Sequence, residues 1–172
     1  MKKTLLLLLL AAACSTFTYA QKDPVRDFFK QYHNVPNAVN LNMQGFMIRL
    51  AANLAEEEEG AQLLKKVKSL HLLVLEDAEP LVRDDFSKLL RDAKGTKFED
   101  LIQISKGLEK VNVMIREKEG TVTDVLIFVS GAEELVLLHL EGRLLFSDLN
   151  DLDIDMDGAE HLKSLPEKRT RA

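Results

Sequence analysis

The spacing of apolar residues predicts an amphipathic helix over residues 23–32. Apolar side chains recur there at intervals of three and four, which places them on one face of a helix. Asp23 suits the N-cap position, and Pro24 suits the first helical turn. The buried face is expected to consist of Val25, Phe28, Phe29 and Tyr32.

The next expected elements are a loop over residues 34–40, an extended piece over 41–43 and helices over 44–54 and 62–67. The second of these helices should turn its apolar side chains inward. The first collects its largest apolar side chains on one face, which consists of Phe46, Met47, Leu50 and Leu54.

A change of pattern at residue 69 predicts a strand and then a helix. Residues 69–75 are too few and too continuously apolar for a surface helix, so we interpret them as a central strand. The following helix begins at Glu79-Pro80, runs to about residue 93 and ends at Gly95.

The second half of the chain alternates between apolar runs and glycine-containing turns. Strands are expected over residues 100–105, 111–117, 121–130 and 135–140. Short turns of this kind favour an antiparallel meander. The longest strand has apolar residues on both faces, so a face left uncovered by helices would mark a partner, a dimer interface or an apolar ligand. The alternative is that the N-terminal helices cover it.

The order of elements predicts an α+β fold, a two-layer sandwich with a mostly antiparallel sheet of about five strands. Its helices are expected on one face, in a variant of the ferredoxin-like arrangement. Residues 21–165 would form this single domain, and residues 166–172 would be a disordered tail.

The first twenty residues are typical of a secretion signal. Lys2 and Lys3 precede an apolar run over residues 5–13, which is too short to span a bilayer. Cleavage is expected after Ala20, which makes residues 1–20 a signal peptide. The protein is therefore expected to be exported, to the periplasm or the outer membrane.

Cys14 leaves a second interpretation of this leader open. The residues before it resemble a bacterial lipobox, although Ala11 stands where a leucine is usual. Acylation of Cys14 would tether the domain to a membrane, since each buried methylene contributes about 0.8 kcal/mol. Cys14 is the single cysteine, so disulfides and thiolate catalysis are excluded from the domain.

The charge of the chain argues against nucleic acid as a partner. The net charge is −5, and removing Lys2 and Lys3 with no acidic residue makes it about −7. A membrane is an expected partner only if Cys14 is lipidated.

An acidic segment near the C-terminus resembles the first half of a calcium loop. Asp153, Asp155 and Asp157 alternate and are followed by a glycine, as in an EF-hand. The twelfth position should supply a bidentate carboxylate, but it is Ser164. These aspartates are therefore weak calcium candidates, and a solvated acidic segment is the alternative.

Histidines provide the remaining candidate chemistry. Metal binding or acid–base catalysis would need two of them to converge with carboxylates. His71 and His139 fall in different predicted strands and could face each other, whereas His33 and His161 have no such partner in the pattern. A buried or rim position explains a lone histidine equally well, so we expect no catalytic residue, no metal and no cofactor.

Three segments resemble an exported family of Bacteroidetes-type bacteria, the domain of unknown function 4252. They are the run LLVLE at residues 72–76, the helix of residues 84–92 and the run VLLHLEG at 136–142. The resemblance covers about residues 25–152. It implies a signal or lipoprotein leader and an association with sigma-factor regulatory genes, and hence envelope signalling. It implies no catalytic residues.

No motif specifies a reaction or a ligand. The leading hypothesis is therefore a non-enzymatic interaction module, periplasmic or membrane-tethered, which binds an unknown protein or a second copy of itself. It requires a contiguous apolar patch or groove on the surface. The alternatives are a carrier with an apolar cavity between sheet and helices, and a hydrolase with His71 or His139 beside a carboxylate in an open cleft.

Overall fold

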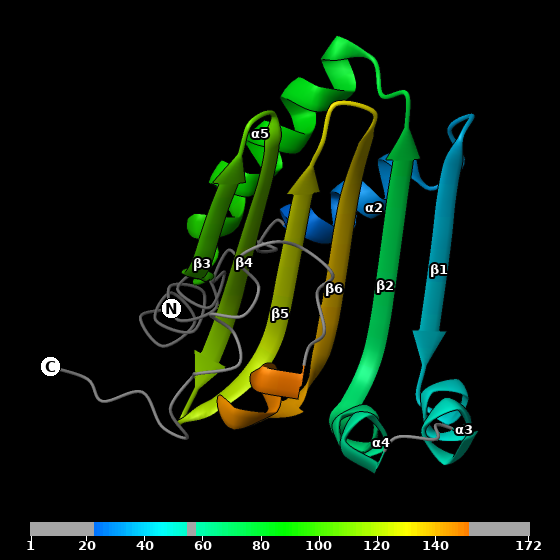
Figure 1. Cartoon of the computed structure of the whole chain (residues 1–172), viewed down its shortest axis with the longest axis vertical. Coiled ribbons are helices and arrows are strands. Elements are labelled where there is room, and N and C mark those ends of the chain that lie inside the picture. The colour runs from blue at the N-terminus through cyan, green and yellow to red at the C-terminus, as the bar shows by residue number, and fades with distance from the viewer. Residues whose placement is uncertain (1–22, 55–57, 152–172) are drawn as a thin grey trace, which may run out of the picture.

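The computed structural model describes residues 23–54 and 58–151, which form a six-stranded sheet with helices on both faces (Figure 1). The elements in chain order are α2 (Pro24–Tyr32), β1 (Ala38–Gln44), α3 (Phe46–Leu54), α4 (Glu58–Lys66), β2 (Val67–Glu76), α5 (Pro80–Lys94), β3 (Glu99–Lys106), β4 (Glu109–Lys118), β5 (Thr121–Ser130), β6 (Glu134–Leu144) and the short 3-10 helix η1 (Ser147–Asp151).

The sheet has the order β1-β2-β6-β5-β4-β3, and every neighbouring pair is antiparallel. The last four strands form the predicted meander, and β2 is an internal strand as predicted. The expected ferredoxin-like variant is not what the structure has. That fold repeats a βαβ unit, whereas here α5 makes one long crossover from β2 to β3, at the far edge of the sheet.

The sixth strand is β1, which the sequence pattern divided between a loop up to residue 40 and a short extended piece over residues 41–43. Asparagine is depleted in strands, and Asn40 and Asn42 alternate with the apolar residues of β1. Its pairing with β2 runs without a register shift over seven residues, from Ala38 opposite Leu75 to Gln44 opposite Ser69. Pairing with an apolar internal strand therefore outweighs the weak local preference.

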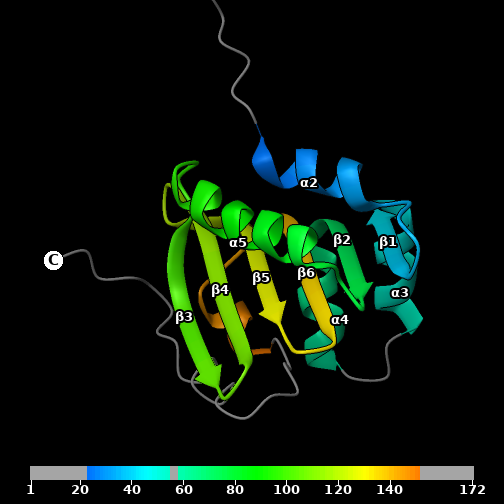
Figure 2. The ribbon, with the colours of Figure 1, turned by 90° about the horizontal axis from the view of Figure 1, so that it is seen from above.

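One face of the sheet is covered by α2 and α5 (Figure 2). All four residues predicted for the buried stripe of α2 are buried. Three aromatic rings connect the helices to the sheet. The ring centroid of Phe86 on α5 lies 5.9 Å from that of Phe28 on α2 and 5.5 Å from that of Phe128 on β5. The hydroxyl of Tyr32 donates to Asp85 at 2.6 Å, and burial together with this contact raises the pKa of Tyr32 to about 12.

The opposite face is covered at one end by α3, α4 and η1, so the prediction that helices occupy one face was wrong (Figure 2). Ile48 of α3 and Leu63 of α4 pack on this face against apolar residues of β4, β5 and β6. Gly142 lets α4 approach β6, because a Cβ there would lie 2.5 Å from the Lys66 carbonyl oxygen.

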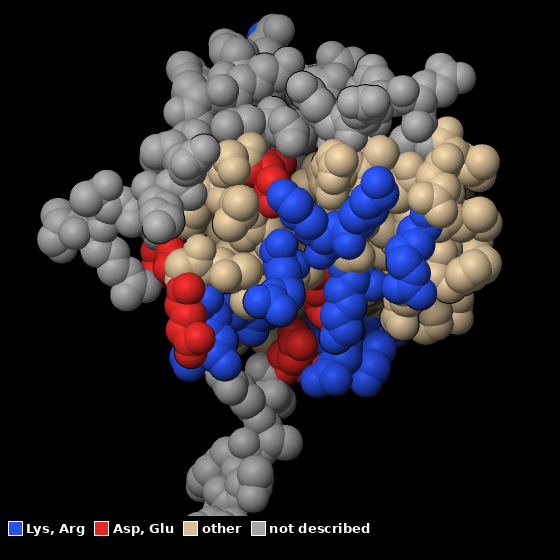
Figure 3. All heavy atoms as spheres, turned by 90° about the horizontal axis from the view of Figure 1, so that it is seen from below, with Lys and Arg blue, Asp and Glu red and all other residues tan. Residues whose placement is uncertain are grey.

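The two ends of the sheet carry opposite charges. Exposed lysines and arginines gather at the end formed by α3, α4, the start of β2 and the end of β6 (Figure 3). They include Arg49, Lys65, Lys68 and Arg143. A hollow of about 650 Å³ at the other end is lined by Glu76, Asp77, Glu109, Glu133 and Glu134. The strands therefore run between an acidic end and a basic end.

Within residues 23–54 and 58–151, every helix is too short or too polar to cross a bilayer.

Candidate functional site

A row of polar side chains crosses the sheet on the face that carries α2 and α5. It comprises Asn40 of β1, His71 of β2, His139 of β6, Asp124 of β5 and Arg116 of β4. Each lies two residues along its strand from a residue that packs in the core beneath these helices, so all five point to the same face. Strands distant in sequence thus supply one continuous polar line.

Asp124 is the most highly connected residue of this row. Its carboxylate accepts hydrogen bonds from Arg116 Nε at 3.0 Å and Nη2 at 2.8 Å, and from the Thr123 hydroxyl at 2.7 Å. His139 Nε2 lies 3.1 Å from Oδ1. Burial alone would raise the pKa of Asp124, but hydrogen bonds from His139 and Thr123 and the charge of Arg116 hold it below its ordinary value. The carboxylate is therefore ionised and accepts from all three groups.

His71 is held by β1 and by α2. Its Nε2 lies 2.9 Å from Asn40 Oδ1, and its ring stacks on Phe29 with the centroids 3.6 Å apart. Burial lowers the pKa of His71, and the nearby His139 and His33 lower it further. The imidazole of His71 is therefore neutral at pH 7.

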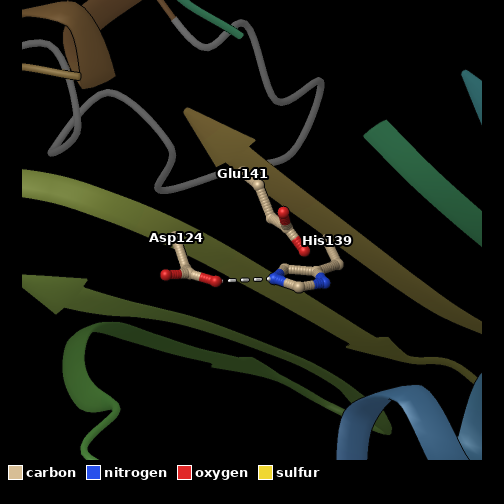
Figure 4. A group of neighbouring side chains, drawn as sticks. All are labelled: Asp124, His139 and Glu141. Atoms are coloured by element: carbon tan, nitrogen blue, oxygen red, sulfur yellow. Dashed lines mark hydrogen bonds and ion pairs between the residues drawn. The ribbon is translucent and has the colours of Figure 1, made fainter. Parts of the chain in front are cut away.

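Glu141 brings a second carboxylate to His139. The two residues are two positions apart along β6. Glu141 is the register partner of Asp124 on β5 and of Ser69 on β2. Ligand atoms of Asp124, His139 and Glu141 all lie within 4.8 Å of one another. Figure 4 shows the Glu141 carboxylate beside the imidazole and the Nδ1 atom of His139 pointing away from Asp124.

A cavity of about 430 Å³ opens over the row. Its floor comes from β1, β2 and β6, and one wall comes from the exposed side of α2. Side chains that line it are Asp23, Arg26, Phe29, Lys30, His33, Asn40, Asn42, Gln44, Ser69, His71, His139 and Glu141. A small polar ligand or ion therefore has access to both imidazoles.

The prediction that His71 and His139 could face each other is confirmed, because they are register partners across β2 and β6. His33 lines the same cavity from α2, and its Nδ1 lies 2.8 Å from the Lys30 carbonyl oxygen. Asp153, Asp155, Asp157, His161 and Cys14 lie outside the described residues.

Sequence reasoning missed Asp124 and Glu141. The spacing of His139 and Glu141, two positions apart in a predicted strand, does place them on one face. Asp124 gives no such signal, since its approach to His139 depends on the register between β5 and β6.

A second candidate surface is apolar and lies on α3. The face predicted from Phe46, Met47, Leu50 and Leu54 exists, but it points to solvent, with Phe46 67% and Leu54 74% exposed. The helix is anchored instead by Ile48 and Ala52. The sequence pattern identified the stripe but not the direction in which it points.

This apolar surface continues onto β1, an edge of the sheet. Val39 and Leu41 are exposed on the same side of the sheet as the core that α3 joins. Hydrogen bonds at both ends of the β1–β2 pair, Gly45 N–H to Lys68 and Glu76 N–H to Asn37, fix which backbone groups face outward. Odd-numbered residues of β1 bond to β2, so the backbone groups of Asn40 and Asn42 point away from the sheet.

The fold and these two surfaces define a small α+β domain with an apolar, accessible sheet edge and a partly buried histidine–carboxylate row. The family model described as Domain of unknown function (DUF4252) matches residues 32–152, well over half of the chain. The chain belongs to this family. No curated protein and no solved structure matched the chain in the corresponding comparisons.

Proposed function

We propose that this chain is an exported, non-enzymatic interaction module that pairs with a second copy of itself through β1 and α3. The observation that carries the proposal is the exposed apolar surface of α3 and β1 beside an open sheet edge. Contiguous apolar patches of this kind mark interaction sites on soluble proteins. Extended edges bind partners by adding a strand.

The sequence of β1 supports a second copy as the partner. Antiparallel pairing about a two-fold axis at Leu41 places Leu41 opposite Leu41, and Val39 opposite Met43. The outward-facing backbone groups of Asn40 and Asn42 then bond to each other, in agreement with the β1–β2 hydrogen-bond pattern. β1 has no charged side chain, so self-pairing places no like charges opposite each other.

The opposite charges of the two ends favour the same arrangement. A two-fold axis across β1 reverses the second copy, so the basic end of one copy lies beside the acidic end of the other. Arg49 on α3 is the basic residue nearest this edge in sequence. Complementary charge of this kind orients partners during encounter.

The proposal of export rests on residues 1–20, with their basic start and apolar run. Cleavage after Ala20 would release the module, and acylation of Cys14 would tether it. The family resemblance supports a place in envelope signalling, where paired modules could present two identical surfaces.

The alternative hypotheses have less support from the structure. Between the sheet and the helices α2 and α5, the described residues form a packed core of buried side chains rather than the space a carrier of apolar ligands needs. A hydrolase needs a histidine beside a carboxylate in an open cleft, and His139 with Asp124 provides that pair. A paired histidine and carboxylate also suit ion binding.

Sedimentation equilibrium of the purified protein tests the pairing. We expect a dimer, and we expect Leu41→Lys to weaken it by about 100-fold or more, because two ammonium groups would meet at the two-fold axis. Leu108→Lys is the matched control, since Leu108 is 80% exposed in the β3–β4 turn and far from β1. A monomeric wild-type protein, or equal effects of both variants, would exclude this interface.

The intact mass of the protein from its native host tests export. Loss of residues 1–20 supports a released module, and an acylated chain beginning at Cys14 supports a tethered one. Recovery of the chain with Met1 still attached would contradict export.

A further inference from the structure

Two carboxylates lie opposite each other on β5 and β6. Asp124 and Glu141 are direct register partners, and both side chains point to the face that carries α2 and α5. Like charges in this position repel each other and destabilise a sheet. Arg116 pairs with Asp124, but within the described residues no lysine or arginine forms an ion pair with Glu141. The two carboxylates therefore outnumber the guanidinium beside them, which favours the binding of a cation.

The imidazole of His139 completes a set of three potential ligands. Its Nε2 atom lies 3.1 Å from Asp124 Oδ1. The ligand atoms of Asp124, His139 and Glu141 all lie within 4.8 Å of one another. Figure 4 shows both carboxylates directed toward the imidazole. The pairing of β5 with β6 thus brings one nitrogen and two oxygen ligands to a single place.

The separation of these atoms suits a shared metal ion. Zn²⁺ binds imidazole nitrogen and carboxylate oxygen at about 2.1 Å, so two such ligands of a tetrahedral ion lie about 3.4 Å apart. The 3.1 Å between His139 Nε2 and Asp124 Oδ1 is close to this value. Glu141 is only partly buried, so rotation of its side chain can bring its carboxylate closer to the other two ligands.

Neighbouring groups already orient the Asp124 carboxylate. Arg116 donates to it through Nε and Nη2, and Thr123 donates through its hydroxyl. The guanidinium of Arg116 lies over the Phe98 ring, 4.4 Å from the centroid. Carboxylates that bind metal ions are commonly held by hydrogen bonds of this kind. Asp124 is therefore fixed in an orientation that directs Oδ1 toward His139.

We propose that Asp124, His139 and Glu141 bind one divalent transition-metal ion, with Zn²⁺ as the best-fitting common ion. Three protein ligands leave the fourth position of a tetrahedral ion free. His139 and Glu141 line the cavity of about 430 Å³, so water or a small ligand can reach that position. An imidazole ligand suits zinc better than calcium or magnesium, which bind through oxygen atoms.

This site is separate from the acidic segment at residues 153–157, and it does not depend on the proposed pairing through β1. The ion would connect β5 to β6 on the face that carries α2 and α5, whereas α3 lies on the opposite face. Because the ligands converge only in the folded chain, bound Zn²⁺ should also raise the melting temperature.

Titration of the purified, metal-free protein with Zn²⁺ against a chromophoric chelator tests the proposal. We expect one Zn²⁺ per chain. Glu141→Gln should weaken binding by more than tenfold and should abolish most of the rise in melting temperature, because it removes one ligand and one negative charge. Glu134→Gln is the matched control, since it makes the same change on the same strand at the acidic end of the sheet. It should bind Zn²⁺ as the wild type does.

Cu²⁺ tests the nitrogen ligand independently. At one equivalent of Cu²⁺, the electron paramagnetic resonance spectrum should report one imidazole nitrogen in the wild type and none in His139→Ala. His33→Ala should retain the nitrogen signal, because His33 lines the same cavity but its Nδ1 contacts the Lys30 carbonyl.

Circular dichroism establishes that each variant is folded, and if His139→Ala does not fold, Glu141→Gln decides the question. Absence of one-to-one Zn²⁺ binding in the wild type, or unchanged affinity in Glu141→Gln, would overturn the proposal. A nitrogen signal that persists in folded His139→Ala would place the ion elsewhere and would overturn it as well.

Discussion

The two edges of the sheet are built in opposite ways. β3 carries Glu99, Asp100 and Lys106, and its pairing with β4 is interrupted by a register shift between Asp100 and Ile102. β1 has no charged residue, no proline and no register shift, and exposed apolar side chains lie beside it. Charges and bulges are the means by which proteins prevent edge strands from pairing. The chain protects one edge and leaves the other able to pair.

The two edge strands should respond differently to added charge. Further charged residues in β3 would add to the charges that already prevent this edge from pairing, whereas charged residues in β1 should remove its capacity to pair. An accessible apolar edge strand is an aggregation risk. The presence of such an edge beside the apolar face of α3 therefore favours a role in specific pairing.

After Leu41→Lys, the largest expected effect on pairing comes from proline in β1. Asn42→Pro removes an outward-facing N–H group and leaves the β1–β2 hydrogen bonds intact, because those bonds belong to odd-numbered residues. Because of the two-fold axis, two hydrogen bonds between the copies are lost. We therefore expect the dissociation constant of the dimer to rise by about 10- to 100-fold. Sedimentation equilibrium measures this, and the melting temperature should change little.

Leu41→Pro is the internal control for that experiment. The N–H group of Leu41 points to β2, so this proline should lower the stability of the fold itself by about 1–3 kcal/mol, because it removes a hydrogen bond between the two strands. Equal behaviour of the two proline variants would show that β1 does not pair through its outer side.

A smaller effect is expected from the charges at the two ends. Arg49→Glu reverses an exposed charge on α3, which the two-fold arrangement places toward the acidic end of the other copy. Exposed charge pairs contribute about 1 kcal/mol or less and the two-fold axis supplies two of them, so the dimer should weaken by about 30-fold at most. Raising the salt concentration should remove the difference between variant and wild type. A difference that persists in 1 M salt would assign the effect to packing instead.

The sequence predicted the fold best where local pattern and tertiary environment agree. The helices α2 and α5 and the four meander strands follow from spacing, caps and turns, because each has an apolar side that the core accepts. Only residues 41–43 of β1 were expected to be extended, because its asparagines are typical of a loop and its pairing with β2 is not a local property. The predicted number of strands was therefore too low. The prediction that all helices cover one face was also wrong, because tertiary packing decides which face a helix covers.

The candidate site was predictable only in part. Alternation places His71, His139 and Glu141 on strand faces, but the position of His71 opposite His139 depends on the β2–β6 register. The contact between His139 and Asp124 depends on a register shift in β5 between Val122 and Asp124, which no spacing in the sequence indicates. Long-range register decides which polar residues meet, and the local spacing of residues does not reveal that register.

The smallest expected effect concerns the protected edge. Glu99→Gln with Asp100→Asn removes two charges from β3, including the partner of Lys94 at 2.6 Å. That pair is partly exposed, so stability should fall by about 1 kcal/mol or less, measured by denaturant unfolding. The sedimentation behaviour should not change, because the register shift between Asp100 and Ile102 still keeps β3 from presenting a regular edge. If neutralising these charges were enough to create a second association surface, charge alone would distinguish the two edges, and the regular geometry of β1 would lose its assigned role.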